Sequence, residues 1–208
     1  MWKCLYIGLK TYINMIRLTN GLYNKRYKLS KITITAMFIS LSVVLRLFKH
    51  VLLGELQIIN FSLVFAIIAG YFYGGFAGFN VGFFSFILSD FYLGFGLWTI
   101  VDGLIAGIIG FMWSLFRWIN DRFLIFILSF LSIFIYDIFT SAILYCLIGF
   151  SLWKAFLIGF IGLFLPVYGG YLYGIGPITE FSSSMLICIL ISRLNSLIKV
   201  NRYGFKNL

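Results

Sequence analysis

The chain has 208 residues, of which 62% are apolar, 21% are aromatic and only 11% are charged. A soluble domain is about half apolar and a quarter charged, so this composition excludes a water-soluble globule, a disordered chain and a disulfide scaffold. Apolar runs of about 18 residues or more recur along the sequence, which is typical of helices that cross a membrane. We therefore predict an all-α fold in a polytopic membrane protein.

The apolar segments predict six transmembrane helices. In chain order they cover residues 32–47, 58–73, 76–93, 97–116, 123–148 and 178–197. The region near 155–176 is also apolar, but Pro166, Pro177 and several glycines interrupt it, and such residues break or kink a helix. We expect a broken, partly re-entrant segment there, with a seventh full span as the alternative.

The distribution of the 16 basic residues favours six spans. With the amino terminus inside, only Arg46, Lys49 and Lys154 fall outside, whereas seven spans would also place the basic tail 199–208 outside. Cytoplasmic segments are enriched in Lys and Arg, so both termini are predicted to be cytoplasmic. The net charge of +10 is thus assigned to the inner face of the membrane, and no nucleic-acid partner is expected.

Residues 1–29 form the first of three predicted regions, ahead of a membrane domain at 30–198 and the basic tail at 199–208. Their apolar side chains fall on one helical face, and Lys3, Lys10 and Arg17 recur every seven residues along its flank. This pattern predicts an amphipathic helix that lies on the lipid surface, with its cations toward the lipid phosphates.

The acidic side chains concentrate toward the predicted outer side. Four of them lie on four different spans: Asp90, Asp102, Asp137 and Glu180. A carboxylate that faces lipid at the centre of a helix costs about 2.5–3.5 kcal/mol on insertion scales, so such groups normally face the bundle interior or water. We predict that these four line a polar cavity that opens outward. The alternative is that each one is simply hydrated near the end of its helix.

Aromatic and hydroxyl side chains accompany two of these acids. Trp98 and Thr99 precede Asp102 by about one turn, and Tyr136 is adjacent to Asp137. Rings and a few polar groups together suit a pocket for a small ring-bearing or cationic molecule. The candidate substrate-binding residues are therefore Asp90, Trp98, Thr99, Asp102, Tyr136, Asp137 and Glu180.

Small residues recur at intervals of four, from Ala66 to Gly82 across the second and third spans, and are predicted to pack helices closely. The sequence has no P-loop, no HExxH or GxSxG motif and a single histidine, His50. We therefore predict no enzyme activity, no metal and no cofactor. Driven uptake would need a partner ATPase or an ion gradient.

The order of features resembles the substrate-binding S component of energy-coupling factor (ECF) transporters. The similar segments are the small-residue span 31–46, the glycine-rich turn 69–78 that leads to Ser89-Asp90, the Gly96-Leu-Trp98-Thr99 run with Asp102-Gly103, and Tyr136-Asp137-Ile-Phe-Thr140. Together they extend over residues 30–195.

The resemblance implies a subunit of the cell membrane that captures a vitamin-like molecule from outside. It further implies that the first outer loop, with Glu55, Gln57 and Asn60, helps to cap the pocket. Ala36 and Ser40 would contact a transmembrane coupling subunit, which joins two ABC ATPases and powers uptake with ATP. The acids and rings favour a cationic or ring-bearing ligand, such as thiamine or a precursor.

Two other functions fit the same composition. A structural scaffold that resembles the rod-shape protein MreD would bind no small molecule and would associate with a cell-envelope complex. A gradient-driven small-solute transporter would work without any ATPase.

Overall fold

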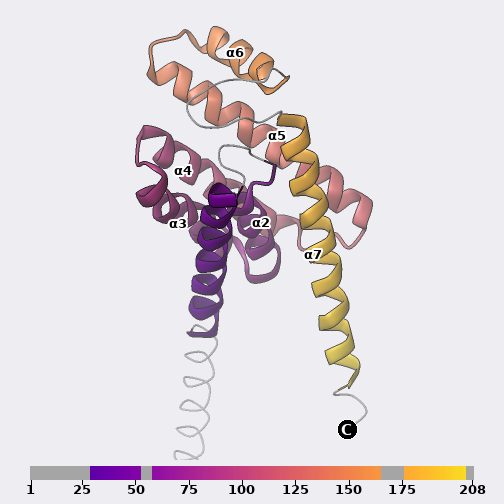
Figure 1. The fold of residues 1–208 in the computed structure, drawn as a ribbon. Coiled ribbons are helices and arrows are strands. Elements are labelled where there is room, and N and C mark those ends of the chain that lie inside the picture. The colour runs from indigo at the N-terminus through magenta and orange to yellow at the C-terminus, as the bar shows by residue number, and fades with distance from the viewer. Residues whose placement is uncertain (1–28, 53–57, 165–175, 205–208) are drawn as a thin grey trace, which may run out of the picture. The chain divides into compact units, whose positions relative to one another are not determined.

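A computed structural model of the chain describes residues 29–52, 58–164 and 176–204. The chain divides into two units, Met1–Ile34 and Thr35–Leu208, and the labelled helices of Figure 1 all belong to the second unit. Within the described residues, all regular structure is helical. The prediction of an all-α fold is confirmed.

The helices follow the predicted apolar segments. A helix at Leu29–Leu52 is followed by α2 (Phe61–Tyr73), α3 (Gly75–Leu93), α4 (Leu97–Met112) with a short 3-10 turn η1 (Trp113–Phe116), α5 (Arg122–Leu147), α6 (Leu152–Phe164) and α7 (Gly176–Gly204). Each of the six predicted spans thus contains a helix. The short helix α6 occupies the first part of the region predicted to be broken, and residues 165–175 lie outside the described residues.

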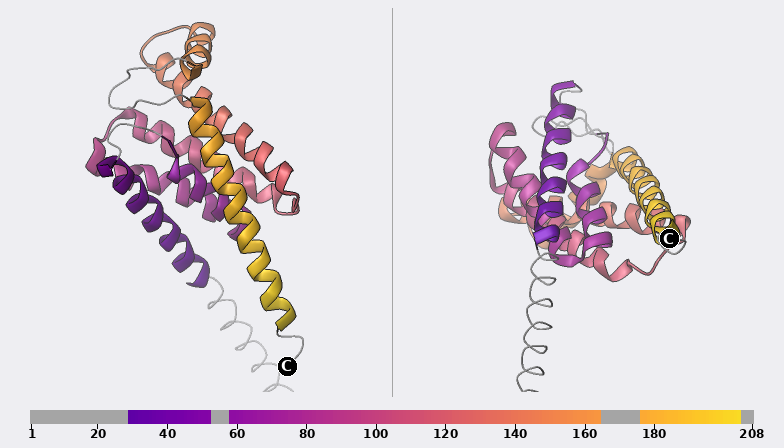
Figure 2. Two further views of the ribbon diagram at one scale, coloured as in Figure 1. Left: turned by 45° about the vertical axis from the view of Figure 1, so that its right-hand side comes forward. Right: turned by 90° about the horizontal axis from the view of Figure 1, so that it is seen from below.

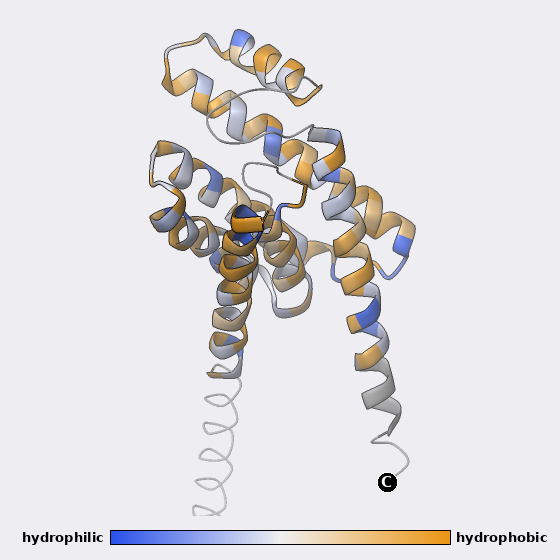
Figure 3. Ribbon diagram, viewed as in Figure 1, coloured by the Kyte–Doolittle hydropathy of each residue, from blue (hydrophilic) through white to orange (hydrophobic). Residues whose placement is uncertain are grey.

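Five of these helices are long and apolar enough to cross a membrane, whereas α2 and α6 have 13 residues each. Apolar residues dominate the helices in Figure 3, and many large apolar side chains are exposed, such as Phe76, Leu97 and Trp153. Exposed apolar surface on this scale fits lipid and not water. The protein is a multi-pass membrane protein; the number of crossings and the side of each terminus remain predictions.

The second predicted span is shorter than the sequence suggests because Asn60 caps it. The Asn60 side chain accepts a hydrogen bond from the Leu63 backbone N–H at 3.2 Å, so α2 begins at Phe61 and not near Ile58. At its other end, Gly74 has φ of +102°, which is unfavourable for a residue with a side chain. This turn separates α2 from α3.

Glycines bring α2, α3 and α4 into close contact. A Cβ atom on Gly70 or Gly78 would overlap the backbone carbonyl of Gly110, and one on Gly82 would lie 2.6 Å from the carbonyl of Ala106. Close backbone approach of this kind favours helix association in lipid, where hydrophobicity alone gives helices no reason to associate. The prediction that the small-residue series packs helices internally is confirmed.

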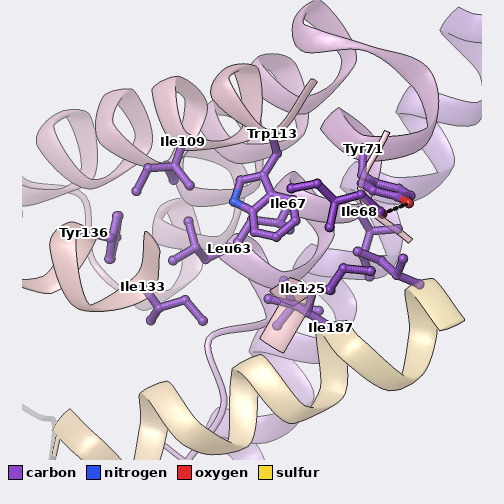
Figure 4. Packing of buried hydrophobic residues seen from close by; sticks show 14 of the residues in the cluster. Leu63, Ile67, Ile68, Tyr71, Ile109, Trp113, Ile125, Ile133, Tyr136 and Ile187 are labelled. Atoms are coloured by element: carbon purple, nitrogen blue, oxygen red, sulfur yellow. Dashed lines mark hydrogen bonds between the residues drawn. The ribbon is translucent and has the colours of Figure 1, made fainter. Parts of the chain in front are cut away.

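The apolar core lies where α2, α4, α5 and α7 meet (Figure 4). It includes Leu63 and Ile67 of α2, Ile133 of α5 and Ile187 of α7, all fully buried. Helix α5 also packs against α6, which folds back along it in the views of Figures 1 and 2. Tyr136 of α5 belongs to the core cluster as well, so the core directly supports one of the predicted site residues.

Candidate substrate-binding site

Four helices contribute the four acids predicted to line a pocket. Asp90 lies at the end of α3, Asp102 in the first half of α4, Asp137 in α5 and Glu180 near the start of α7. Asp90 and Glu180 are buried, and Asp102 and Asp137 are partly buried. We refer to Asp90, Asp102, Asp137 and Glu180 as the acidic array.

At one end of the array, Asp90 forms an ion pair with Arg46 of helix Leu29–Leu52. Arg46 Nη2 lies 2.9 Å from Asp90 Oδ1, and Arg46 Nη1 donates to Ser89 Oγ at 2.6 Å. The guanidinium also lies over the Phe86 ring, 4.3 Å from its centroid, an arrangement that adds a cation–π attraction. Asp90 is 2% exposed, so this pair ties the first helix to α3 inside the protein.

Thr99 connects the ion pair to α4. Its hydroxyl donates to Asp90 Oδ2 at 2.7 Å and accepts the Gly96 N–H at 3.2 Å, so it also caps the start of α4. Both oxygens of Asp90 therefore have partners: Oδ1 contacts Arg46, and Oδ2 accepts from Thr99. The buried carboxylate is well compensated, as a stable buried charge must be.

The middle of the array contains Asp102, Tyr136 and Asp137. Asp102 and Asp137 are partly buried, and Tyr136 immediately precedes Asp137 on α5. The Tyr136 ring is buried and lies 6.0 Å from that of Phe86. Tyr136 thus connects the apolar core to the polar array.

Glu180 forms the other end of the array. It is 0% exposed, and neither of its carboxylate oxygens has a hydrogen-bond partner among the described residues. One turn further along α7, the Ser183 hydroxyl accepts the Asn60 backbone N–H at 3.0 Å, and Ser182 donates to the Ile58 carbonyl. The start of α7 is therefore fastened to the segment that precedes α2.

The remaining predicted residues have different surroundings. Trp98 packs over Gly96 and is 51% exposed, so it lies at the rim and not among the acids. Of the predicted lid residues, Asn60 is buried as the cap of α2, whereas Glu55 and Gln57 lie outside the described residues. No group of three or more metal-ligating side chains occurs in the described ranges.

Sequence reasoning did not identify Arg46 or Ser183 as part of the site. Arg46 had been assigned only to the outer end of the first span, although a cation near the end of an apolar helix, opposite several acids on other spans, is a useful indication of an ion pair. Ser183 gave no indication of its role, because serines occur at three consecutive positions on α7.

Comparison with known proteins identifies the family. The family model described as "ECF-type riboflavin transporter, S component" matches residues 26–175, which is most of the chain. This protein is an ECF S component. The resemblance found in the sequence is thereby confirmed, and the family is one of transporter substrate-binding subunits and not of enzymes. No curated protein and no solved structure matches the chain.

Proposed function

We propose that this S component binds riboflavin from the outer side of the plasma membrane and delivers it for ATP-driven uptake. Two observations support the proposal. The matching family is named for riboflavin transport, and four acids on four helices form a polar array inside a protein whose outer surface is apolar. Polar groups within an apolar surround are typical of a small-molecule site.

Charge pairing favours a neutral ring-bearing ligand over a cation at the Asp90 end. Arg46 already compensates Asp90 at 2.9 Å, so a ligand cation there would compete with an existing guanidinium. The isoalloxazine ring of riboflavin is uncharged and flat, and its chain bears hydroxyl groups. Trp98 at the rim, which is 51% exposed, offers an aromatic face to such a ring system, and carboxylates accept hydrogen bonds from hydroxyls.

The exposed face of helix Leu29–Leu52 supports the proposed coupling partner. Ala36 and Ser40 are exposed, and so are the larger Met37, Leu41 and Val44 beside them. Small residues within an exposed apolar face permit another helix to approach closely. We propose that this face docks on a transmembrane coupling subunit that joins two ABC ATPases.

Calorimetric titration of the purified protein with riboflavin tests the ligand. We expect one bound molecule and an affinity near 1 nM, which corresponds to about 12 kcal/mol. Thiamine, a cation, serves as the comparison and is expected to bind at least a hundredfold more weakly. Absence of riboflavin binding in a folded, monodisperse sample would overturn the proposal.

Affinity capture from native membranes tests the partner. The wild-type protein should co-purify with a pair of ABC ATPases, and the Ala36→Leu/Ser40→Leu double variant should lose them while it still binds riboflavin. The matched control is Leu41→Ala on the same exposed face, which removes bulk and should retain the ATPases. Equal capture by the double variant would exclude this face as the docking surface.

A further inference from the structure

Glu180 is the acid of the array whose two carboxylate oxygens are both fully buried and have no hydrogen-bond partner among the described residues. Burying a polar group without a partner costs free energy, and the cost is larger for a carboxyl than for a neutral hydroxyl. A side chain in this state needs a reason to persist, and occupancy by a ligand that supplies the missing hydrogen bonds is one such reason.

The other groups around Glu180 are polar but already paired. Ser184 donates to the Glu180 backbone carbonyl at 2.6 Å, and Ser183 accepts the Asn60 N–H. Neither hydroxyl donates to the Glu180 carboxyl, although both lie on the same helix within about one turn of it.

A buried carboxyl with two open oxygens suits a particular ligand chemistry. Hydroxyl groups donate to carboxylate oxygens, and a polyhydroxyl chain presents several of them in a row. The isoalloxazine ring has a single N–H donor, so by itself it can supply a hydrogen bond to only one of the two Glu180 oxygens. A polyhydroxyl chain can donate to both oxygens without an additional charge.

We propose that Glu180 lies in a polyol subsite, which binds the hydroxylated chain of the ligand and gives the protein its preference for riboflavin over the bare flavin ring. The proposal rests on the proposed function and deepens it. It concerns α7 in particular, which begins at Gly176, immediately after the residues matched by the family model. Glu180 is therefore assigned from the contacts of this chain alone.

A cycle of two ligands and two proteins tests the subsite. The ligands are riboflavin and lumiflavin, in which a methyl group replaces the polyhydroxyl chain, and the proteins are the wild type and Glu180→Leu. The wild type should bind riboflavin at least tenfold more tightly than lumiflavin. Glu180→Leu should weaken the binding of riboflavin by about tenfold or more and change the affinity for lumiflavin by less than twofold.

Glu180→Gln keeps the size of the side chain and one acceptor oxygen, and its NH2 group can donate to a ligand hydroxyl, so it should retain riboflavin affinity within about threefold. Asp121→Asn is the matched control, because it removes an acid that caps α5 outside the array. It should leave the affinities for both ligands unchanged. If Glu180→Leu weakens the binding of both ligands equally, or of neither, the subsite is refuted. The proposed riboflavin binding is not refuted by that result.

The comparison of riboflavin with lumiflavin on the wild-type protein does not depend on whether any variant folds. Equal affinity of the wild type for riboflavin and lumiflavin refutes the subsite by itself. Failure of the folded wild type to bind either ligand refutes the proposed function instead, so the two failures are distinguishable.

Discussion

The two ends of the acidic array differ in how their carboxyls are compensated. Asp90 contacts a guanidinium and a hydroxyl at hydrogen-bond distance, whereas Glu180 is equally buried and has no partner among the described residues. The same type of group therefore has opposite surroundings at the two ends. A compensated acid holds helices together, and an uncompensated acid adds no stability until a ligand arrives.

This difference separates structural acids from ligand-binding acids. The Asp90 end joins helix Leu29–Leu52, α3 and α4 through Arg46 and Thr99, next to the glycine contacts that hold α3 against α4. At the Glu180 end, Phe181 of α7 packs against Phe126 of α5, with ring centroids 5.5 Å apart, while the Glu180 carboxyl itself has no partner among the described residues. We expect substitutions at the first end to lower stability, and substitutions at the second end to weaken binding without lowering stability.

The largest expected effect is that of Arg46→Met. It leaves the buried Asp90 carboxylate without its cation, and removing one partner of a buried ion pair destabilises a protein by about 3–5 kcal/mol. Thermal unfolding in detergent, followed by the loss of monodisperse protein, should show a clearly lower Tm.

Two further variants sharpen this test. Arg46→Met/Asp90→Leu should recover much of the lost stability, because replacement of both partners by apolar groups removes the uncompensated charge. Lys49→Met removes a cation one turn along the same helix and should leave the Tm nearly unchanged. A Tm for Arg46→Met equal to that of the wild type would mean that the ion pair does not hold these helices.

Glu180→Leu should have the opposite effect on stability. It removes a buried carboxyl that lacks partners, which costs a protein about 1–3 kcal/mol, so the ligand-free protein should melt at a higher temperature than the wild type. Melting curves without ligand measure the effect, and Glu180→Gln is the isosteric comparison. A lower Tm for Glu180→Leu would show that Glu180 is compensated and structural.

Thr99→Val should destabilise the protein by a smaller amount than Arg46→Met. The change preserves shape but removes the hydrogen bond to Asp90 and the cap on the Gly96 N–H, which together are worth about 1–2 kcal/mol. Thr99→Ser keeps the hydroxyl and serves as the control. Indistinguishable melting curves for the Val and Ser variants would count against the bridging role.

The smallest expected effect is that of Ser183→Ala. It leaves the Asn60 backbone N–H without an acceptor, at a cost of about 1 kcal/mol. Ser184→Ala is the matched control, since its hydroxyl bonds only within α7. Hydrogen exchange of the Asn60 amide should be faster in the Ser183 variant alone. Unchanged exchange would show that Ser183 does not fasten the start of α2.

The sequence was sufficient to predict the helices and the presence of the four acids on separate spans, because hydropathy reports on burial in lipid directly. It could not predict which acid is paired. Arg46 and Asp90 are far apart in the sequence, and their contact depends on how α3 and the first helix pack. Nor could hydropathy predict the start of α2, since the Asn60 cap lies within a continuous apolar stretch.

An experimental structure of the protein with bound riboflavin is the most direct test of the shared site. We predict that the ligand lies between α4, α5 and α7, with its hydroxyl chain within hydrogen-bond distance of Glu180. A ligand bound elsewhere, or a bound state in which this carboxyl faces lipid, would contradict the account.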